Sequence, residues 1–269
     1  MNLRRHTSIA ILIIVLLTVF LSISCEEILK LNITGDGNII TDTLRWRNNY
    51  TIRDIQLADD FILEIYQSEK PALHIEADSN LLSYIKTDFL RNTLTIRRQS
   101  DHFLKPSKNI TIRLFINNLS VIDVWNKGTV VCDTLTATTL HVNTYRKSNF
   151  SCKYAEVENL FFRAEGSTKV DINGNFIYLD YSQIGSGESF LNGNVETLKL
   201  LQEGSGKIEA FDLEANVAFI SLIHSGLIYC YVSNFLTVDL KGTGRVYYKG
   251  NPETEISIEG SGGVYSGSL

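Results

Sequence analysis

A short glycine-rich phrase recurs at a nearly constant interval through the second half of this chain. Complete copies, Gly-Ser-Gly or Gly-Thr-Gly, begin at Gly185, Gly204, Gly242 and Gly260. Degenerate copies begin at Asn126, Arg146, Gly166 and His224, and each copy starts 18 to 20 residues after the one before it. A fixed period of this length is typical of solenoid proteins, in which each repeat stacks on its neighbours.

Each copy lies between two segments in which apolar and polar residues alternate. The residue four positions before the phrase is apolar or aromatic in every copy: Ile122, Val142, Phe162, Tyr181, Leu200, Ile220, Val238 and Ile256. The residue three positions before it is polar in nearly every copy. Four positions after the phrase the residue is apolar in all copies but one, where Ser189 stands. The pattern predicts two strands per repeat, each with one inward face, joined by a glycine corner.

The corner requires a backbone conformation that glycine adopts without steric cost. Asn126 and His224 replace the first glycine in two copies, and both residue types tolerate positive φ better than most. We therefore predict an all-β fold: a parallel β-helix-like solenoid of about eight rungs over residues 119–269. Equivalent side chains of successive rungs should stack in continuous ladders.

Residues 26–118 alternate like strands but show no clean repeat. We expect strands over 52–57, 61–67, 72–77, 93–97 and 110–116, and a loop over 102–108. A short helical turn is expected over 78–84, with Asp78 or Ser79 as its cap. Because the open end of a solenoid exposes unpaired backbone groups, we predict that this irregular β region starts and caps the rod.

The first 25 residues have the pattern of a secretory signal peptide. Arg4 and Arg5 precede a strongly apolar run from Ile9 to Leu21, which is short for a membrane span. The run leads to Cys25 in a sequence that resembles a bacterial lipobox, although Ser22 stands where leucine is usual. Two interpretations follow. Either Cys25 is lipidated and anchors an exported outer-membrane or periplasmic lipoprotein to the membrane, or the leader is simply cleaved.

Composition and motifs exclude several classes of function. The formal charge of −5 becomes more negative once the two leader arginines are removed, which disfavours nucleic acid as a partner. The five histidines lack the spacing of zinc ligands, and the sequence contains no Gly-x-Ser-x-Gly nucleophile elbow. We therefore expect a protein that is not an enzyme and that binds no metal or cofactor.

Three cysteines, Cys132, Cys152 and Cys230, share the position six after the phrase, which strand alternation turns inward. They are expected as small buried hydrophobes in one ladder. A disulfide between Cys132 and Cys152, on neighbouring rungs, is the alternative that an oxidising compartment would permit.

The C-terminal end carries a more specific pattern. Gly-Thr-Gly-Arg-Val-Tyr-Tyr-Lys-Gly-Asn-Pro at 242–252 is followed by Gly-Ser-Gly at 260–262. This pattern resembles the end of the GIN-domain family of auto-transporter adhesin heads, which is common in Bacteroidetes envelopes. Residues 77–85 and 92–96 are similar to the family's first half, and the resemblance covers about residues 31–267. The resemblance implies a β-helix-like fold and an exported protein, and it transfers no catalytic residues.

Outward aromatic side chains are the candidates for a binding face: Phe161, Phe219, Tyr247 and Tyr265. Aromatic residues are also common in strands for packing reasons alone.

The first hypothesis is a non-catalytic cell-envelope protein whose solenoid binds a glycan or a protein. The second is a structural role, with homo-oligomers formed through the shortened last rung. A β-helix polysaccharide-active enzyme comes third, since it would need acids and bases clustered on one outward row.

Overall fold

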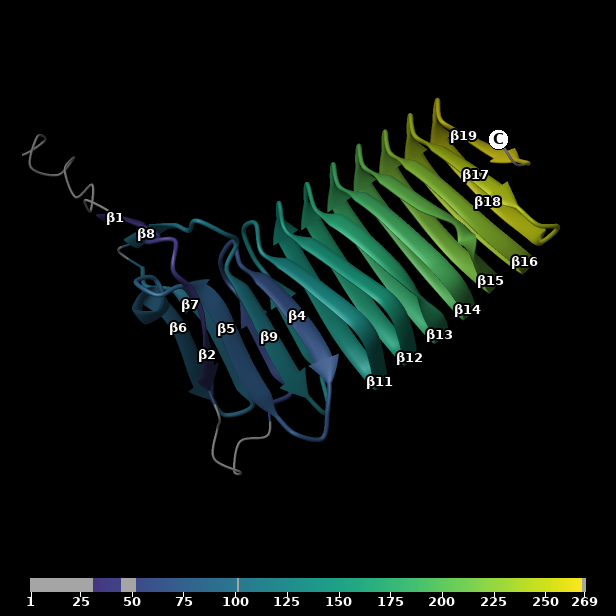
Figure 1. Cartoon of the computed structure of the whole chain (residues 1–269). Helices are drawn as coiled ribbons and strands as arrows, with labels where there is room; N and C mark the ends of the chain where they lie inside the picture. The colour runs from purple at the N-terminus through teal and green to yellow at the C-terminus, as the bar shows by residue number, and fades with distance from the viewer. Residues whose placement is uncertain (1–30, 45–51, 101, 268–269) are drawn as a thin grey trace, which may run out of the picture.

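The computed structural model describes residues 31–44, 52–100 and 102–267, and they form a β-rich end region joined to a long rod (Figure 1). The end region contains β1 (Leu31–Thr34), β2 (Ile39–Leu44), β3 (Asp54–Leu57), β4 (Ile62–Gln67), β5 (Ala72–Asp78), the 3₁₀ turn η1 (Leu82–Tyr84), β6 (Ile85–Leu90), β7 (Thr93–Arg98), β8 (His102–Lys105) and β9 (Thr111–Ile116).

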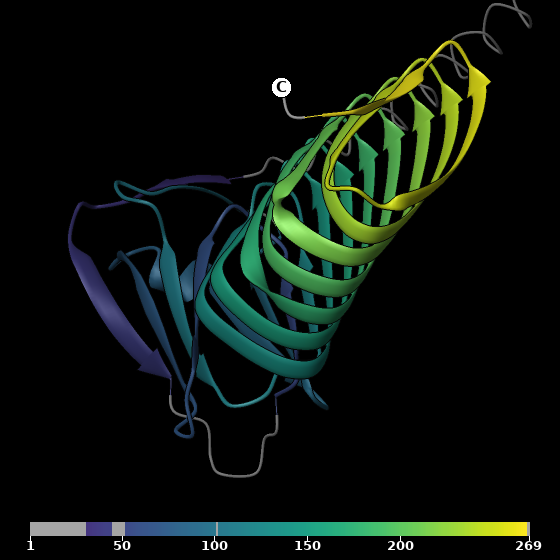
Figure 2. The same cartoon turned by 90° about the vertical axis from the view of Figure 1, so that its right-hand side faces the viewer.

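The rod contains β10 (Val121–Val124), β11 (Thr129–Arg146), β12 (Asn149–Gly166), β13 (Lys169–Gly185), β14 (Glu188–Gly204), β15 (Lys207–His224), β16 (Leu227–Gly242), β17 (Arg245–Lys249), β18 (Glu253–Gly260) and β19 (Gly263–Ser266). Each of the strands β11 to β16 bends around the rod, and Figure 2 shows the turns as nested loops along one axis.

Successive turns pair in parallel and in register. Leu179 of β13 faces Leu198 of β14, which faces Ala218 of β15, and the same order continues along the rod. The predicted fold class is therefore confirmed: the protein is an all-β solenoid. It has about seven turns where about eight rungs were expected, because eight corners delimit only seven complete intervals.

A residue of positive φ begins every predicted corner, and the corners form the row of sharp tips along the rod in Figure 1. At Gly204 φ is 115°, and an added Cβ would lie 2.5 Å from the carbonyl oxygen of Gly185 in the preceding turn. The degenerate copies that lack the first glycine also have positive φ at this position, with values of 63° at Asn126, 66° at Arg146 and 81° at His224. The corner thus requires a positive-φ backbone conformation, which residues other than glycine adopt only at a cost in free energy.

The predicted inward residues form the core. Those four positions before the phrase, from Ile122 to Val238, are at most 3% exposed. Ile256 breaks the series at 44% exposure, because β18 pairs with β16 and has no strand on its outer side in the described part of the chain. Cys132, Cys152 and Cys230 are buried free thiols, as expected for ladder residues, and Cys132 faces Cys152 in register.

A buried polar cluster explains the serine that interrupts the apolar ladder. Ser189 donates to Gln183 Oε1, and its hydroxyl lies 2.5 Å from that of Tyr181. Gln183 Nε2 donates to the carbonyl oxygen of Gly187 at 2.9 Å and to Gln202 Oε1 at 2.7 Å. Both glutamines are fully buried. Gln183 is paired at both ends of its amide, which offsets the cost of its burial, whereas Gln202 Nε2 has no hydrogen-bond partner among the described residues.

The end region stacks on the rod in an order different from that of the sequence. β3 lies between β7 and β10, and β4 lies between β9 and β11, with parallel pairing throughout. Antiparallel strands then follow: β6 pairs with β7, β5 with β9, and β2 with β5. The sheet thus changes from parallel to antiparallel pairing at the end away from the C-terminus (Figure 1).

The local predictions for this region were partly right. The five expected strands occur as β3, β4, β5, β7 and β9, each within two residues of the expected bounds. The loop expected at 102–108 is wrong in its first half, where β8 pairs in parallel with β1. The helical turn is present as η1, but Leu81 is its N-cap and no side chain caps it.

Asp78 was wrongly expected as the cap, and it instead fixes two loops. Its buried carboxylate accepts hydrogen bonds from the Ser107 hydroxyl at 2.6 Å and from the backbone N–H groups of Ser107 at 2.9 Å and Gly37 at 2.8 Å. The Ser107 hydroxyl is the main cause that holds the pKa of Asp78 below its usual value of 3.8. These contacts tie the segment between β1 and β2 to the end of β5.

Arg146→Gly should stabilise the protein by about 0.5–1 kcal/mol, because it relieves a left-handed conformation that costs an L-residue more than glycine loses in chain entropy. Lys147→Gly is the matched control, since Lys147 is a neighbouring exposed residue without positive φ. It should destabilise by a similar amount. Urea denaturation of both variants measures the difference, and equal effects of the two glycines would contradict the corner geometry.

Asp78→Asn should lower the free energy of unfolding at neutral pH and have little effect in acid. A carboxyl group with a lowered folded pKa stabilises above its unfolded pKa, and that contribution is lost as the pH falls below about 4. Urea denaturation from neutral pH down to about pH 3 tests this. The exposed Asp88, which pairs with Arg97 at 2.7 Å, provides the control variant Asp88→Asn. A gap between Asp78→Asn and wild type that stays constant with pH would refute the assignment.

Candidate functional site

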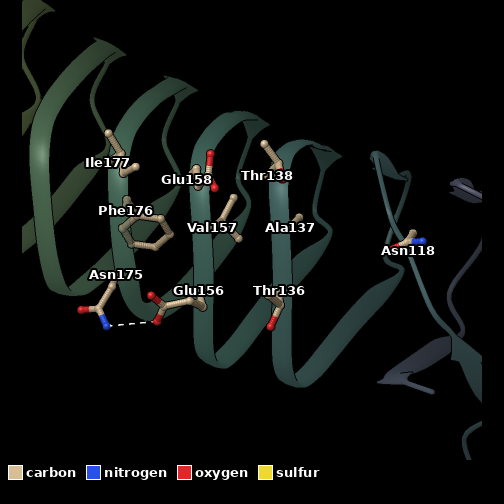
Figure 3. Close-up of a pocket in the computed structure, with 10 residues that line it drawn as sticks. All are labelled: Asn118, Thr136, Ala137, Thr138, Glu156, Val157, Glu158, Asn175, Phe176 and Ile177. Carbon is tan, nitrogen blue, oxygen red and sulfur yellow. Dashed lines mark hydrogen bonds between the residues drawn. The ribbon is translucent and has the colours of Figure 1, made fainter. Parts of the chain in front are cut away.

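A groove follows the rod along the side away from the glycine corners, where each turn bends between its two long arms. One row of outward side chains borders it, and its members face one another in register: Thr136, Glu156, Asn175, Asn194 and Glu214. Figure 3 shows the first three in line on β11, β12 and β13.

A second outward row lies two residues further along each turn. Thr138, Glu158 and Ile177 form its beginning in Figure 3, and Glu196 and Asn216 continue it on β14 and β15. Between the rows lie the smaller or buried side chains of Ala137, Val157, Phe176, Val195 and Ala215. The groove therefore has borders that are polar except at Ile177, and most of the side chains between the borders are buried in the core.

Three adjoining hollows make up the groove. The largest has a volume of about 490 Å³ and extends from Asn118 to Ile177. A second, of about 420 Å³, shares Glu156 and Asn175 with it and continues to Ser233. A third, of about 330 Å³, shares Thr136 and continues to Arg53. Because neighbouring hollows share their lining residues, an elongated ligand could lie along several turns of the rod.

Hydrogen bonds between turns order the borders. Asn194 Nδ2 donates to Asn175 Oδ1 at 3.0 Å, and Asn175 Nδ2 donates to Glu156 Oε2 at 3.2 Å and to the Tyr154 hydroxyl oxygen at 2.8 Å. Tyr154 donates to Glu156 at 2.7 Å, and this bond is the main cause that lowers the pKa of Glu156. In the second row Asn216 donates to Glu196. Held in this way, the side chains lose less conformational entropy when a ligand binds.

The arrangement suits a ligand rich in hydroxyl groups. Carboxylates accept hydrogen bonds, and amides both donate and accept them, so the borders can pair with groups of either kind. The described residues include no group of three His, Cys, Asp or Glu side chains placed to hold a metal ion. In the same part of the chain no helix is long and apolar enough to cross a membrane.

The four aromatic residues predicted as a binding face do not lie together. Phe161 and Phe219 occupy one row before the corner, separated by Asp180 and Lys199, which form an ion pair at 2.9 Å. Tyr247 and Tyr265 face each other in register on the arm after the corner. The two pairs are therefore on different sides of the rod.

Stacking covers the ring faces of two of these aromatics, Phe161 and Tyr247. Tyr229, Tyr247 and Tyr265 stack with centroids 5.2 Å apart, and Phe161 stacks on His141 at 4.8 Å. Phe219 is 45% exposed and makes no ring contact with the rest of the described chain. Tyr265, the last ring of its stack, is 47% exposed, so Phe219 and Tyr265 are the two of the four whose ring faces can receive a sugar ring.

Sequence reasoning missed the groove residues, although a signal was present. Asn-Gly-Asn occurs at 173–175 and again at 192–194, at the period of the repeat. Gly174 and Gly193 allow close approach of successive turns, since a Cβ on Gly193 would collide with the carbonyl oxygen of Gly174. The asparagines that follow them, Asn175 and Asn194, belong to the groove border. Cys25, the predicted lipidation site, lies outside the described residues.

The fold defines an all-β solenoid protein. Comparison with known families gives it a place: the chain belongs to the family described as "putative auto-transporter adhesin, head GIN domain", whose model matches residues 51–252. The resemblance inferred from the C-terminal pattern is thus confirmed. Membership indicates a secreted or envelope-associated protein of adhesin type, and no catalytic family is indicated.

Solved structures with the same fold come from Bacteroidales. A "putative lipid binding protein" from Parabacteroides distasonis is 25% identical over 88% of this chain and 100% of its own, with a TM-score of 0.77. A "putative adhesin" from Parabacteroides merdae is 21% identical over 88% of this chain and 99% of its own, with a TM-score of 0.78. The second likeness concerns the fold alone. No curated protein matches the sequence significantly.

Proposed function

We propose that the protein is a non-catalytic, adhesin-like protein of the cell envelope that holds an extended glycan along its groove. The observation that carries the proposal is the pair of ordered polar rows that border adjoining hollows over five turns of the rod. The leader and Cys25 support export and anchoring through an N-terminal lipid.

The repeat distance of the rod favours a glycan over a peptide. Successive turns are about 4.8 Å apart, whereas residues of an extended peptide rise about 3.3 Å each. Side chains of a peptide lying lengthwise would therefore drift out of step with the rows. The length of one ring in an extended sugar chain is closer to the spacing between successive turns.

The name of the first structural relative raises a lipid as an alternative ligand. The groove is bordered on both sides by carboxylates and amides, among them Glu156, Glu158 and Asn194. An acyl chain would desolvate these groups without offering hydrogen bonds in return, which is costly. A hydroxyl-rich ligand would replace the lost water contacts.

Self-assembly through the last turn is supported less well. Ile256 and Ile258 are exposed there, on an edge strand that could accept another chain. The outward positions of the same strand hold Glu253, Glu255 and Glu259. Two copies of β18 paired edge to edge would bring these carboxylates together, and charges of this kind protect edge strands from association.

Asn175→Ala combined with Asn194→Ala should weaken glycan binding about tenfold or more, because each lost hydrogen bond contributes about 1 kcal/mol. An array of neutral, acidic and amino glycans identifies the ligand for the wild type, and calorimetry measures the variants. Asn143→Ala is the control, since Asn143 pairs with Asp123 on a different row. If Phe219→Ala abolishes binding and the double variant does not, the ligand lies outside the groove.

A further inference from the structure

The groove carries one sign of charge along most of its length. Its two larger hollows are lined by four carboxylates, those of Glu156, Glu158, Glu196 and Glu214, and by no lysine or arginine. The nearest cationic lining residue is Arg53, in the third hollow at the far end. A groove with this charge repels acidic polymers and attracts cationic ones.

The carboxylates stand on both borders. Glu156 and Glu214 belong to the first row, and Glu158 and Glu196 to the second. Glu156 and Glu196 are each held by a hydrogen bond from an asparagine, Asn175 and Asn216. Glu158 and Glu214 are exposed and have no ionic partner in the described part of the chain. They are therefore free to pair with a charge on a ligand.

We infer that the groove binds a β-linked hexosamine polymer whose amino groups are free and protonated. This inference rests on the proposed glycan-binding function and adds the chemical class of the glycan. Successive sugars of a β-(1→4)-linked chain turn opposite sides to the same direction, so their ammonium groups alternate between the two borders. In one register, ammonium groups at the β12, β14 and β15 turns meet Glu158, Glu196 and Glu214, while the ring at β13 faces Asn175. These charge-assisted hydrogen bonds are stronger than neutral ones.

The rest of the groove fits the same ligand. The asparagine amides can pair with sugar hydroxyls, which donate and accept hydrogen bonds in turn. Ile177, which is 59% exposed on the second border, offers apolar contact to the C–H groups of a pyranose ring. An acetylated chain would keep these contacts and lose the charge pairs.

The test compares a glucosamine hexamer with its N-acetylated counterpart by calorimetry at mildly acidic pH. The wild type should bind the free amine about tenfold more tightly, and added salt should reduce that difference. Glu158→Gln combined with Glu214→Gln should bring the two ligands to nearly equal affinity. Glu253→Gln combined with Glu255→Gln removes the same charge from exposed sites on β18 and should leave the preference unchanged.

Each outcome separates this inference from the proposal beneath it. Equal binding of both hexamers to the wild type refutes the amino-sugar preference but leaves glycan binding intact. An equal loss of preference in the β18 variant also refutes it, because the attraction would then depend on net charge. Equally tight binding of a lysine oligomer would also refute it, because the groove would then bind any polycation and not an amino sugar in particular. If the protein binds none of the glycans, both proposals fail.

Discussion

Parallel, in-register pairing between successive turns is the constraint on which the whole structure depends. Each turn must return to the same place after 18 to 20 residues, so that its backbone groups meet those of the turn before. The tight corner makes this return possible, and there the chain takes positive φ in all eight copies, whether the residue is Gly204 or Arg146. Once the corner is fixed, strand alternation decides which side chains point inward.

The same register determines the surface. Any outward residue type that recurs from turn to turn becomes a row, and the properties of a row differ from those of a single residue. The tyrosines at 229, 247 and 265 stack on one another, so they stabilise the arm and cover the ring faces of Tyr247 between its two neighbours. The asparagines and glutamates at the opposite bend form hydrogen bonds between turns and leave their polar groups accessible along a groove.

Periodicity alone was enough to predict the solenoid, its corners and its inward ladders, because each depends on residues a few positions apart. The buried Gln183 and Gln202 could not be inferred in the same way, since a polar residue at an inward position becomes tolerable only through partners such as Ser189 and Gly187. The order of the end region was also beyond local reasoning. β3 pairs with β7 and β10, which follow it by some 40 and 70 residues, and no local pattern specifies such partners.

The candidate site was predictable only in part. Alternation assigned the aromatics to outward positions, but it could not reveal that stacking covers the ring faces of Phe161 and Tyr247. The second bend carries a visible signal in Asn-Gly-Asn at 173–175 and 192–194, whose meaning depends on knowing that both copies border one groove. The net charge of the chain could be read from the sequence. That Glu156, Glu158, Glu196 and Glu214 gather along one groove is visible only in the folded structure.

The central claim is that ligands lie along the groove between the two polar rows. Nuclear magnetic resonance of the side-chain amide groups tests it most directly, during titration with a glucosamine oligomer. The account predicts that the signals of Asn175, Asn194 and Asn216 shift, while that of Asn143, which pairs with Asp123 on another row, stays in place. Unchanged groove amides, with shifts centred instead on residues around Phe219 or Tyr265, would contradict it.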